Sequence, residues 1–198
     1  MRILVSISGG GSFADYARRS GRLESTLEIV SDRPENRVPV DHVIPRRGNA
    51  VYWQEFTELA LGFDLLFLNS NWIVPLESLE RLSGIFVINQ HPSLLPSFKG
   101  LNVWGDILAS GATVSGCTFH LVTEDLDAGP IICQVAYPIP AGCTAEELSR
   151  INYFESRDVY VQVLRWFEQN RVRCEDGEVT IAGVSHAGRL VSPLLENE

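Results

Sequence analysis

The sequence predicts an α/β protein with a Rossmann-like, mostly parallel sheet, helices on both faces of that sheet, and a single domain. Short apolar runs alternate with helical patterns through the first half of the chain, which is the order typical of parallel sheets. Most of these runs are apolar without a break, as expected for strands that are covered on both faces. The chain has 198 residues, of which 45% are hydrophobic, and this length is sufficient for a large buried core.

The first half of the chain supplies the predicted parallel strands. The opening run Arg2–Ile7 is followed by glycines and then by a helical segment. Turn residues such as Pro34 separate later segments, because proline lacks the N–H that a helix or a strand ladder needs. We predict strands at 2–7, 27–31, 42–44, 63–68 and 85–88, and helices at 13–20, 51–61 and 76–82.

The pattern changes after Gly100. Residues 114–122 and 130–139 alternate between apolar and polar side chains, which predicts a strand pair joined by a loop. Thr144 and Glu147 have the spacing of a capping box, so a long helix should begin there and continue to Gln169. A polar tail with two strands completes one domain over 1–198, with parts at 1–84, 85–170 and 171–198.

Charge and cysteine content disfavour several classes of protein. Lys and Arg number 16 against 25 Asp and Glu, and the net charge of -9 disfavours a nucleic acid or an anionic membrane as a partner. None of the four cysteines stands in a C-x-x-C pair, so the sequence signals neither a zinc site nor a redox motif, and we expect no metal. The apolar start is too short for a signal peptide, and nothing approaches the length of a membrane span. We therefore expect a cytoplasmic protein.

A glycine-rich loop follows the first predicted strand. The segment Ser8–Ser12 would place backbone amides at the start of a helix, where anions bind readily. Gly9, Gly11 and Ala14 also satisfy the dinucleotide pattern G-x-G-x-x-G/A, and Asp32 ends the second strand, where a ribose ligand is expected. The loop is compatible with dinucleotide binding, with a simpler phosphate site, or with a tight turn that binds nothing.

Asn89 and His91 follow the predicted strand 85–88. Alternate residues of a strand point to the same side, so both side chains should face the ligand edge beyond the carboxyl ends of the strands. Taken alone, a histidine at a strand end is more often structural than catalytic, and asparagine is also common in turns. Asp127, before Ala128 and Gly129, likewise fits a simple hairpin turn.

Together, these three residue types suit acyl transfer to an amine. An amide donor or an imidazole can stabilise the oxyanion of a tetrahedral intermediate. A histidine can carry protons from the attacking amine to the leaving nitrogen, and a carboxylate can orient the imidazole. Asn89, His91 and Asp127 would supply these groups without a metal or a covalent intermediate.

Two segments carry a family resemblance. Asn89–Pro96 reads N-Q-H-P-S-L-L-P, and Leu126–Pro130 reads L-D-A-G-P. The combination is specific, and with the loop Ser8–Ser12 the likeness extends from Met1 to Trp166, over most of the chain. The sequence resembles the folate-dependent formyltransferase family, and within it most closely the members that formylate glycinamide ribonucleotide.

The resemblance implies a function and a site. The chain would transfer a formyl group from the cosubstrate 10-formyltetrahydrofolate to a primary amine, glycinamide ribonucleotide in purine biosynthesis being the best match, as a monomer or a homodimer. Asn89 and His91 would contact the formyl oxygen, and Asp127 would pair with His91 and relay a proton. The resemblance places the folate against Asn71, Trp72, Ile73, Thr123 and Asp125, and a substrate phosphate against Gly10, Gly11 and Ser12.

Phe13 and Ser156 depart from the family pattern. The family's phosphate loop continues with an asparagine where this chain has Phe13, and a glutamate that holds the nucleotide aligns with Ser156. Arg46 and Arg47 are the candidates for a basic phosphate contact. An amino-sugar nucleotide or another small amine is therefore an alternative acceptor. A non-catalytic module that binds a nucleotide or a folate is the alternative of a different class.

Overall fold

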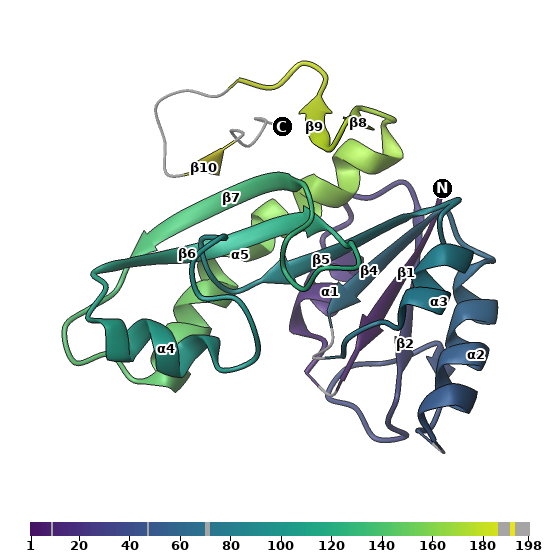
Figure 1. The fold of residues 1–198 in the computed structure, drawn as a ribbon, viewed down its shortest axis with the longest axis horizontal. Coiled ribbons are helices and arrows are strands. Elements are labelled where there is room, and N and C mark those ends of the chain that lie inside the picture. Colours follow the sequence, from purple (N-terminus) through teal and green to yellow (C-terminus); the bar gives the residue numbers. More distant parts are fainter. Residues whose placement is uncertain (9, 47, 70–71, 186–190, 193–198) are drawn as a thin grey trace. The chain divides into compact units, whose positions relative to one another are not determined.

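The structure is a computed structural model, and it describes residues 1–8, 10–46, 48–69, 72–185 and 191–192. The chain divides into two compact units, Met1–Asn89 (unit 1) and Gln90–Glu198 (unit 2). Figure 1 shows the elements of both units, coloured along the sequence.

Unit 1 contains a parallel sheet of five strands among its described residues. The central strand β1 (Arg2–Ile7) pairs with β2 (Thr26–Ser31), which pairs with β3 (His42–Val43). On its other side β1 pairs with β4 (Leu65–Asn69), which pairs with β5 (Phe86–His91). Almost every residue of β1 and β4 is buried, as their unbroken apolar runs predict.

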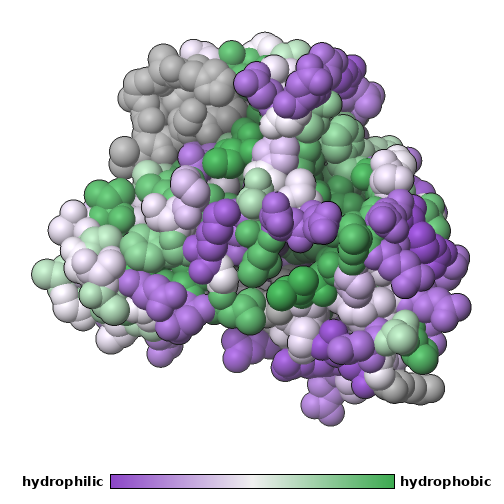
Figure 2. All heavy atoms as spheres, viewed as in Figure 1, coloured by the Kyte–Doolittle hydropathy of each residue, from purple (hydrophilic) through white to green (hydrophobic). Residues whose placement is uncertain are grey.

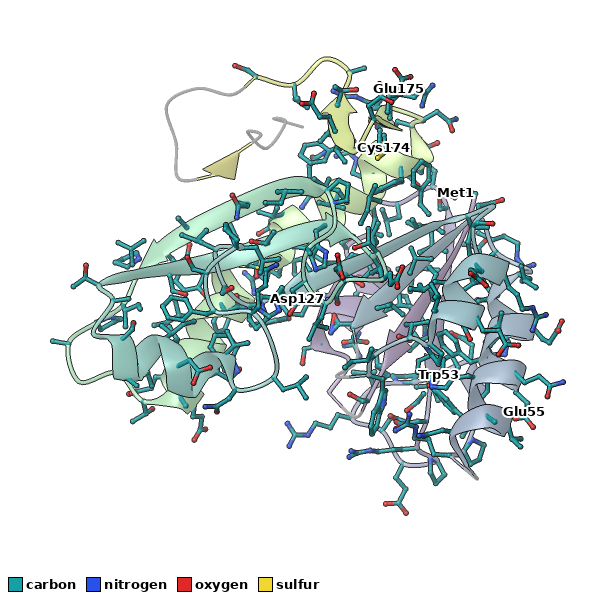
Figure 3. The ribbon with its side chains drawn as sticks, in the orientation of Figure 1. Met1, Trp53, Glu55, Asp127, Cys174 and Glu175 are labelled. Carbon is teal, nitrogen blue, oxygen red and sulfur yellow. The ribbon has the colours of Figure 1, made fainter. Side chains whose placement is uncertain are left out.

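The helices of unit 1 cover both faces of its sheet. α1 (Ser12–Arg19) connects β1 to β2. α2 (Asn49–Ala60) connects β3 to β4 and α3 (Leu76–Arg81) connects β4 to β5, so these two connections cross the sheet in the direction opposite to that from β1 to β2. Because such crossovers are right-handed, α1 lies on one face and α2 and α3 lie on the other, as Figure 1 shows. Figure 3 shows Glu55 pointing away from unit 1, while Trp53 on the same helix is buried.

The register of unit 1 aligns the carboxyl ends of four strands. Ile7 at the end of β1 lies opposite Ser31 of β2 and opposite Asn69 of β4. Ser31 in turn lies opposite Val43, the last residue of β3. These four residues form one row across the sheet, and the loops beyond them share one edge. We call this row and the loops that follow it the carboxyl edge of unit 1.

Unit 2 combines antiparallel strands with two helices. β6 (Val114–Leu121) and β7 (Ile131–Pro138) form a hairpin, and β10 (Val191–Ser192) pairs with β7. α4 (Val103–Ser110) and α5 (Ala145–Glu168) contribute to a core cluster that includes Val103, Ile107, Tyr137 and Leu148. A second hairpin joins β8 (Val172–Glu175) to β9 (Glu178–Ile181).

The structure confirms the predicted fold class and most of the predicted elements. The capping box is present, because Glu147 N donates to Thr144 Oγ1 and Thr144 N donates to Glu147 Oε2. Three differences remain, the first being that the tail predicted with two strands contains three, β8, β9 and β10. The strand predicted at 85–88 continues to His91, and α4 was not predicted, because a helix of eight residues spans only about two turns.

Part of the surface is hydrophilic, and the four cysteines form no disulfide bond with one another. On the face shown in Figure 2, hydrophilic side chains cover much of the surface over α2 and α3. Cys117 and Cys133 are buried, Cys174 is exposed, and all four cysteines are free. In the part of the chain that the structure describes, no helix has the length and apolar character needed to cross a membrane.

Candidate active site

The structure brings His91 and Asp127 together inside unit 2. Nδ1 of His91 lies 3.4 Å from Oδ2 of Asp127, and each side chain is only 6% exposed. Electrostatic interactions between such buried groups are screened less than on the surface. Asn89 occupies the alternate position of β5 and is half-buried, so its side chain leaves the strand on the same side as His91. The catalytic roles of the three residues remain predictions.

The segment 97–100 contacts both members of this pair. Nε2 of His91 lies 2.8 Å from the carbonyl oxygen of Phe98, and the amide of Gly100 donates to Oδ2 of Asp127 over 2.9 Å. Both nitrogens of His91 therefore face oxygen acceptors, and only a ring with a hydrogen on each nitrogen donates to both. A substrate that is to reach Nε2 must first displace the Phe98 carbonyl.

His120 is the second imidazole beside Asp127. Its Nε2 lies 3.9 Å from Oδ1 of Asp127, and its Nδ1 lies 2.9 Å from the carbonyl oxygen of Leu121. Burial lowers the pKa of His120, against the opposing effects of the Leu121 carbonyl and the Asp127 charge. The neutral ring donates from Nδ1 to Leu121, so its Nε2 carries no hydrogen for Asp127. This geometry suits a structural residue.

Hydrogen bonds fix the segment that follows His91. The hydroxyl of Ser93 donates to Ser97 O over 2.6 Å, and the hydroxyl of Thr118 donates to Ser93 O over 2.7 Å. Thr118 Oγ1 also accepts from the amide of Leu95, and Gln134 Nε2 donates to Leu95 O. The strand pair β6–β7 therefore holds the chain on the carboxyl side of His91 in one conformation.

Two glycines allow close approaches around the site. A Cβ at Gly116 would lie 2.4 Å from Leu94 Cδ2, and a Cβ at Gly129 would lie 1.8 Å from Leu121 O. Neither position can hold a side chain without a shift of its neighbours. Asp127 itself has a φ of 50°, a conformation that aspartate adopts more readily than most residues. Figure 3 labels Asp127, which lies in the loop between β6 and β7.

The predicted phosphate residues Gly10, Gly11 and Ser12 lie at the carboxyl edge of unit 1. Gly11 is the N-cap of α1 with a φ of 68°, and no described side chain caps the helix there. A Cβ at Gly11 would lie 2.5 Å from Val38 Cγ2, so this turn requires glycine. The first amides of α1 are therefore suited to an anion. Gly9 lies outside the described residues.

The residues predicted to contact a folate are divided between the units. Trp72 and Ile73 belong to unit 1, where Trp72 is half-buried and Ile73 is 61% exposed. Thr123 and Asp125 are exposed in the β6–β7 loop of unit 2, where Thr123 Oγ1 donates to Asp125 O. Asn71 lies outside the described residues.

Ser156 stands where the family has a glutamate, so α5 carries no carboxylate at this position. Ser156 is buried, its hydroxyl donates to Asn152 O, and Gln90 Nε2 donates to Ser156 Oγ over 3.5 Å. The neighbouring Glu155 is exposed. The place of the family's glutamate therefore holds a short hydroxyl group engaged within the protein.

Sequence reasoning missed several residues that shape the site. Phe98 and Gly100 contact His91 and Asp127 through backbone atoms, and backbone contacts leave no signal in side-chain patterns. Thr118 and Gln134 are polar residues within predicted strands, and this polarity could have identified them as residues that shape the site. Within the described residues, no three His, Cys, Asp or Glu side chains are grouped so as to hold a metal ion.

Comparison with known proteins adds an independent line of evidence. The profile of the formyl transferase family matches residues 71–164. A phosphoribosylglycinamide formyltransferase from Escherichia coli (strain K12) is 31% identical over 92% of this chain and 94% of its own length. The crystal structure of glycinamide ribonucleotide transformylase 1 from Symbiobacterium toebii superposes with a TM-score of 0.81 at 32% identity, over 91% of this chain and 93% of the other.

A longer relative shows higher identity. The trifunctional purine biosynthetic protein adenosine-3 of Bos taurus is 43% identical over 90% of this chain. This chain spans only 19% of the length of that protein. The similarity therefore concerns one part of a larger polypeptide.

Proposed function

Because the chain belongs to the formyl transferase family, we propose that it transfers a formyl group from 10-formyltetrahydrofolate to the primary amine of glycinamide ribonucleotide in purine biosynthesis. The observation that carries the proposal is the buried His91–Asp127 pair at the end of the strand that also carries Asn89. A module that only binds a nucleotide or a folate does not require a proton-carrying pair of this kind.

Asn89 and His91 are proposed to stabilise the transition state. The amide of Asn89 donates to the formyl oxygen as that oxygen gains negative charge, and the imidazole of His91 supplies a second donor. Both groups are placed by one strand, so little reorganisation is needed when the charge develops. Displacement of the Phe98 carbonyl from Nε2 of His91 would precede this contact.

His91 and Asp127 are proposed to move the proton. The amine nitrogen attacks the formyl carbon, the bond between that carbon and N10 of the folate breaks, and one proton passes from the amine to N10. Asp127 orients His91 through Nδ1 and stabilises the imidazolium form while the proton is in transit. The group transfer is balanced without a metal or an external reductant.

The remaining contacts concern the two substrates. The exposed loop Thr123–Leu126 presents backbone polar groups and the half-exposed side chain of Leu126, a chemistry that fits a flat heterocycle such as a pterin. Gly10, Gly11 and Ser12 are proposed to bind the phosphate of the acceptor with their amides, and Trp72 and Ile73 remain candidates for folate contacts.

Mass spectrometry of the products tests the proposal. The protein is incubated with 10-formyltetrahydrofolate and, separately, with glycinamide ribonucleotide, an amino-sugar nucleotide and a simple amine. We expect a product that carries one formyl group with glycinamide ribonucleotide. Formylation of the amino-sugar nucleotide alone would make that compound the acceptor, and binding of both substrates without any product would indicate a binding module.

We also propose where and in what form the chain acts. Its net charge of -9 is unfavourable for contact with nucleic acids and anionic membranes, so its partners are small molecules. We propose a cytoplasmic monomer or homodimer. Size-exclusion chromatography with light scattering measures the oligomeric state, and a tetramer or larger assembly would contradict the proposal.

A further inference from the structure

Unit 2 has a surface cavity of about 410 Å³ that is separate from the His91–Asp127 pair. Its walls come from the turn at 140–143, between β7 and α5, and from residues of α5 between Glu147 and Glu155. Cavities of this volume are typical of sites that bind small molecules. Neither His91 nor Asp127 lines it, so a ligand in this cavity would occupy a site of its own.

The cavity lies against a different face of α5 from the one that carries Ser156. The helix residues that line it follow one another at intervals of three or four positions, so they share one face of the helix. Ser156 does not line the cavity and is buried, whereas its neighbour Glu155 does line it and is exposed. A ligand in the cavity would therefore leave the hydrogen bonds of Ser156 intact.

The walls of the cavity are held in place by the protein itself. The amide of Cys143 donates to Pro140 O over 3.1 Å, and the capping box of Thr144 and Glu147 fixes the start of α5. Cys143 and Ile151 also pack against the core cluster of unit 2. A cavity with such walls is formed before a ligand arrives, so binding requires little ordering of the chain.

Two opposite charges at the cavity have no partner within the described protein. Arg150 and Glu155 are exposed, and neither forms a hydrogen bond or an ion pair with another described residue. Glu147 differs from them, because its Oε2 accepts from the amide and from the hydroxyl of Thr144. The Thr144 amide is the main cause of the lowered pKa of Glu147, and the charge of Arg150 makes the smallest contribution.

The cavity also has an apolar wall. Ile151 is half-buried, and Phe154 is 53% exposed although it is large and aromatic. The Phe154 ring is held by Tyr153, with 5.4 Å between the ring centres, and by Arg157, whose Cζ lies 5.1 Å from the Phe154 ring centre. An exposed aromatic ring in a fixed position beside a cavity favours a ligand with an apolar part.

We propose that this cavity binds a free α-amino acid with an aliphatic or aromatic side chain. The carboxylate accepts hydrogen bonds from the planar guanidinium of Arg150, and the ammonium donates to the carboxylate of Glu155. The apolar side chain packs against Ile151 and Phe154. Arg150 and Glu155 are five residues apart, about 7.5 Å along the helix axis, and both side chains are long enough to reach a ligand between them.

Protection of Cys143 from alkylation by iodoacetamide tests the proposal in the full chain. Cys143 lines the cavity, whereas Cys174 is exposed elsewhere and serves as the internal control. Mass spectrometry of peptides measures how fast each thiol reacts. We expect L-phenylalanine to slow the alkylation of Cys143 severalfold and to leave Cys174 unchanged. Calorimetric titration measures the same affinity if Cys143 does not react.

Two derivatives of the probe each lack one of its charges. N-acetylphenylalanine has no ammonium and phenylalanine amide has no carboxylate, so each should bind about 10-fold more weakly than L-phenylalanine, the effect of losing one charged hydrogen bond. In Arg150→Gln, L-phenylalanine and phenylalanine amide should bind equally. In Glu155→Gln, L-phenylalanine and N-acetylphenylalanine should bind equally.

Control variants separate these contacts from general effects of charge. Glu146→Gln removes an exposed carboxylate from the same helix, and Arg173→Gln removes an exposed arginine from β8; neither residue lines the cavity. Both variants should bind L-phenylalanine as wild type does. Circular dichroism checks the fold of each variant.

The outcomes keep this proposal apart from the proposed function. If wild type binds L-phenylalanine and both derivatives equally, or does not bind L-phenylalanine, the proposal is wrong. Unchanged binding in Arg150→Gln and Glu155→Gln would also overturn it. Formylation of an amine is measured separately, so protein that formylates glycinamide ribonucleotide but does not bind L-phenylalanine would refute the amino-acid site alone.

Discussion

The surroundings of His91 in unit 2 and the carboxyl edge of unit 1 differ in how many of their polar atoms have partners. His91, Asp127, Ser93 and Thr118 each have close polar contacts within the protein. At the carboxyl edge of unit 1, one buried atom in each of Asp32, Arg46, Asn69 and Trp72 has no hydrogen-bond partner among the described residues. Groups that carry out proton transfer must be held in one geometry before the substrate arrives. Groups that bind a polar ligand can obtain their hydrogen bonds from the ligand itself.

The largest effect is expected at Asp127. Asp127→Asn keeps the size of the side chain but removes the charge that orients His91, so turnover should fall at least about 100-fold. The unfolding free energy should change little, because the amide oxygen can still accept from Gly100 N. Steady-state kinetics measure the first quantity and urea denaturation the second.

Asp125→Asn is the matched control, since Asp125 is exposed in the same loop. Turnover within about threefold of wild type is expected for this variant, as for surface changes in general. If Asp127→Asn and Asp125→Asn were equally active, the fixed His91–Asp127 pair would have no catalytic role. The contrast between the two regions would then not hold for unit 2.

Thr118→Val should reduce stability. The change removes the acceptor for the buried amide of Leu95 and the donor to the carbonyl of Ser93. Leaving such groups unpaired costs about 1–3 kcal/mol of unfolding free energy. Thr123→Val is the control, because Thr123 is exposed and its hydroxyl bonds only within the loop. Equal stability of the two variants would show that the bonds around Ser93 contribute nothing.

A smaller, pH-dependent effect is expected at Glu28 of β2, where polar groups are paired. Nε2 of His42 lies 2.7 Å from Oε2 of Glu28, and this hydrogen bond, with help from Arg2, lowers the pKa of Glu28 from its ordinary 4.5. A carboxylate whose folded pKa is lowered stabilises the fold above the unfolded pKa, and that contribution is lost as the pH falls through the folded pKa.

Glu28→Gln should therefore destabilise the protein at pH 7 by less than about 1 kcal/mol, the range of partly exposed ion pairs. The difference from wild type should shrink as the pH falls below the ordinary Glu pKa of 4.5 and vanish once Glu28 has taken up its proton. Thermal unfolding between pH 3 and 7 measures this, with the exposed Glu35→Gln as the control. A difference that grows as the pH falls would refute the assignment.

The smallest effect is expected at Asn69. Its Oδ1 is buried without a partner among the described residues, so Asn69→Leu removes an unsatisfied group and keeps the shape. The unfolding free energy without ligand should be unchanged or slightly higher, in contrast to Thr118→Val. A loss of more than about 1 kcal/mol would show that Asn69 has a structural partner, and the comparison between the two regions would no longer hold.

The sequence by itself determined the strand and helix order of unit 1 and the pairing of His91 with Asp127. The unbroken apolar runs of β1 and β4 and the capping box of α5 are local signals, because a strand buried on both faces needs apolar residues throughout and a helix start needs acceptors for its first amides. The pairing was implied because the segments around Asn89 and Asp127 match a family pattern.

Only the tertiary structure decided which loop ends meet. Arg46 follows β3 and Trp72 follows β4, strands that β1 and β2 separate in the sheet, yet Cζ of Arg46 lies 3.4 Å from the centre of the Trp72 ring. Phe98 reaches His91 through a carbonyl oxygen that every residue type possesses. Local patterns encode burial and backbone preference, whereas these contacts depend on the path of loops between distant elements, which residue spacing along the chain does not specify.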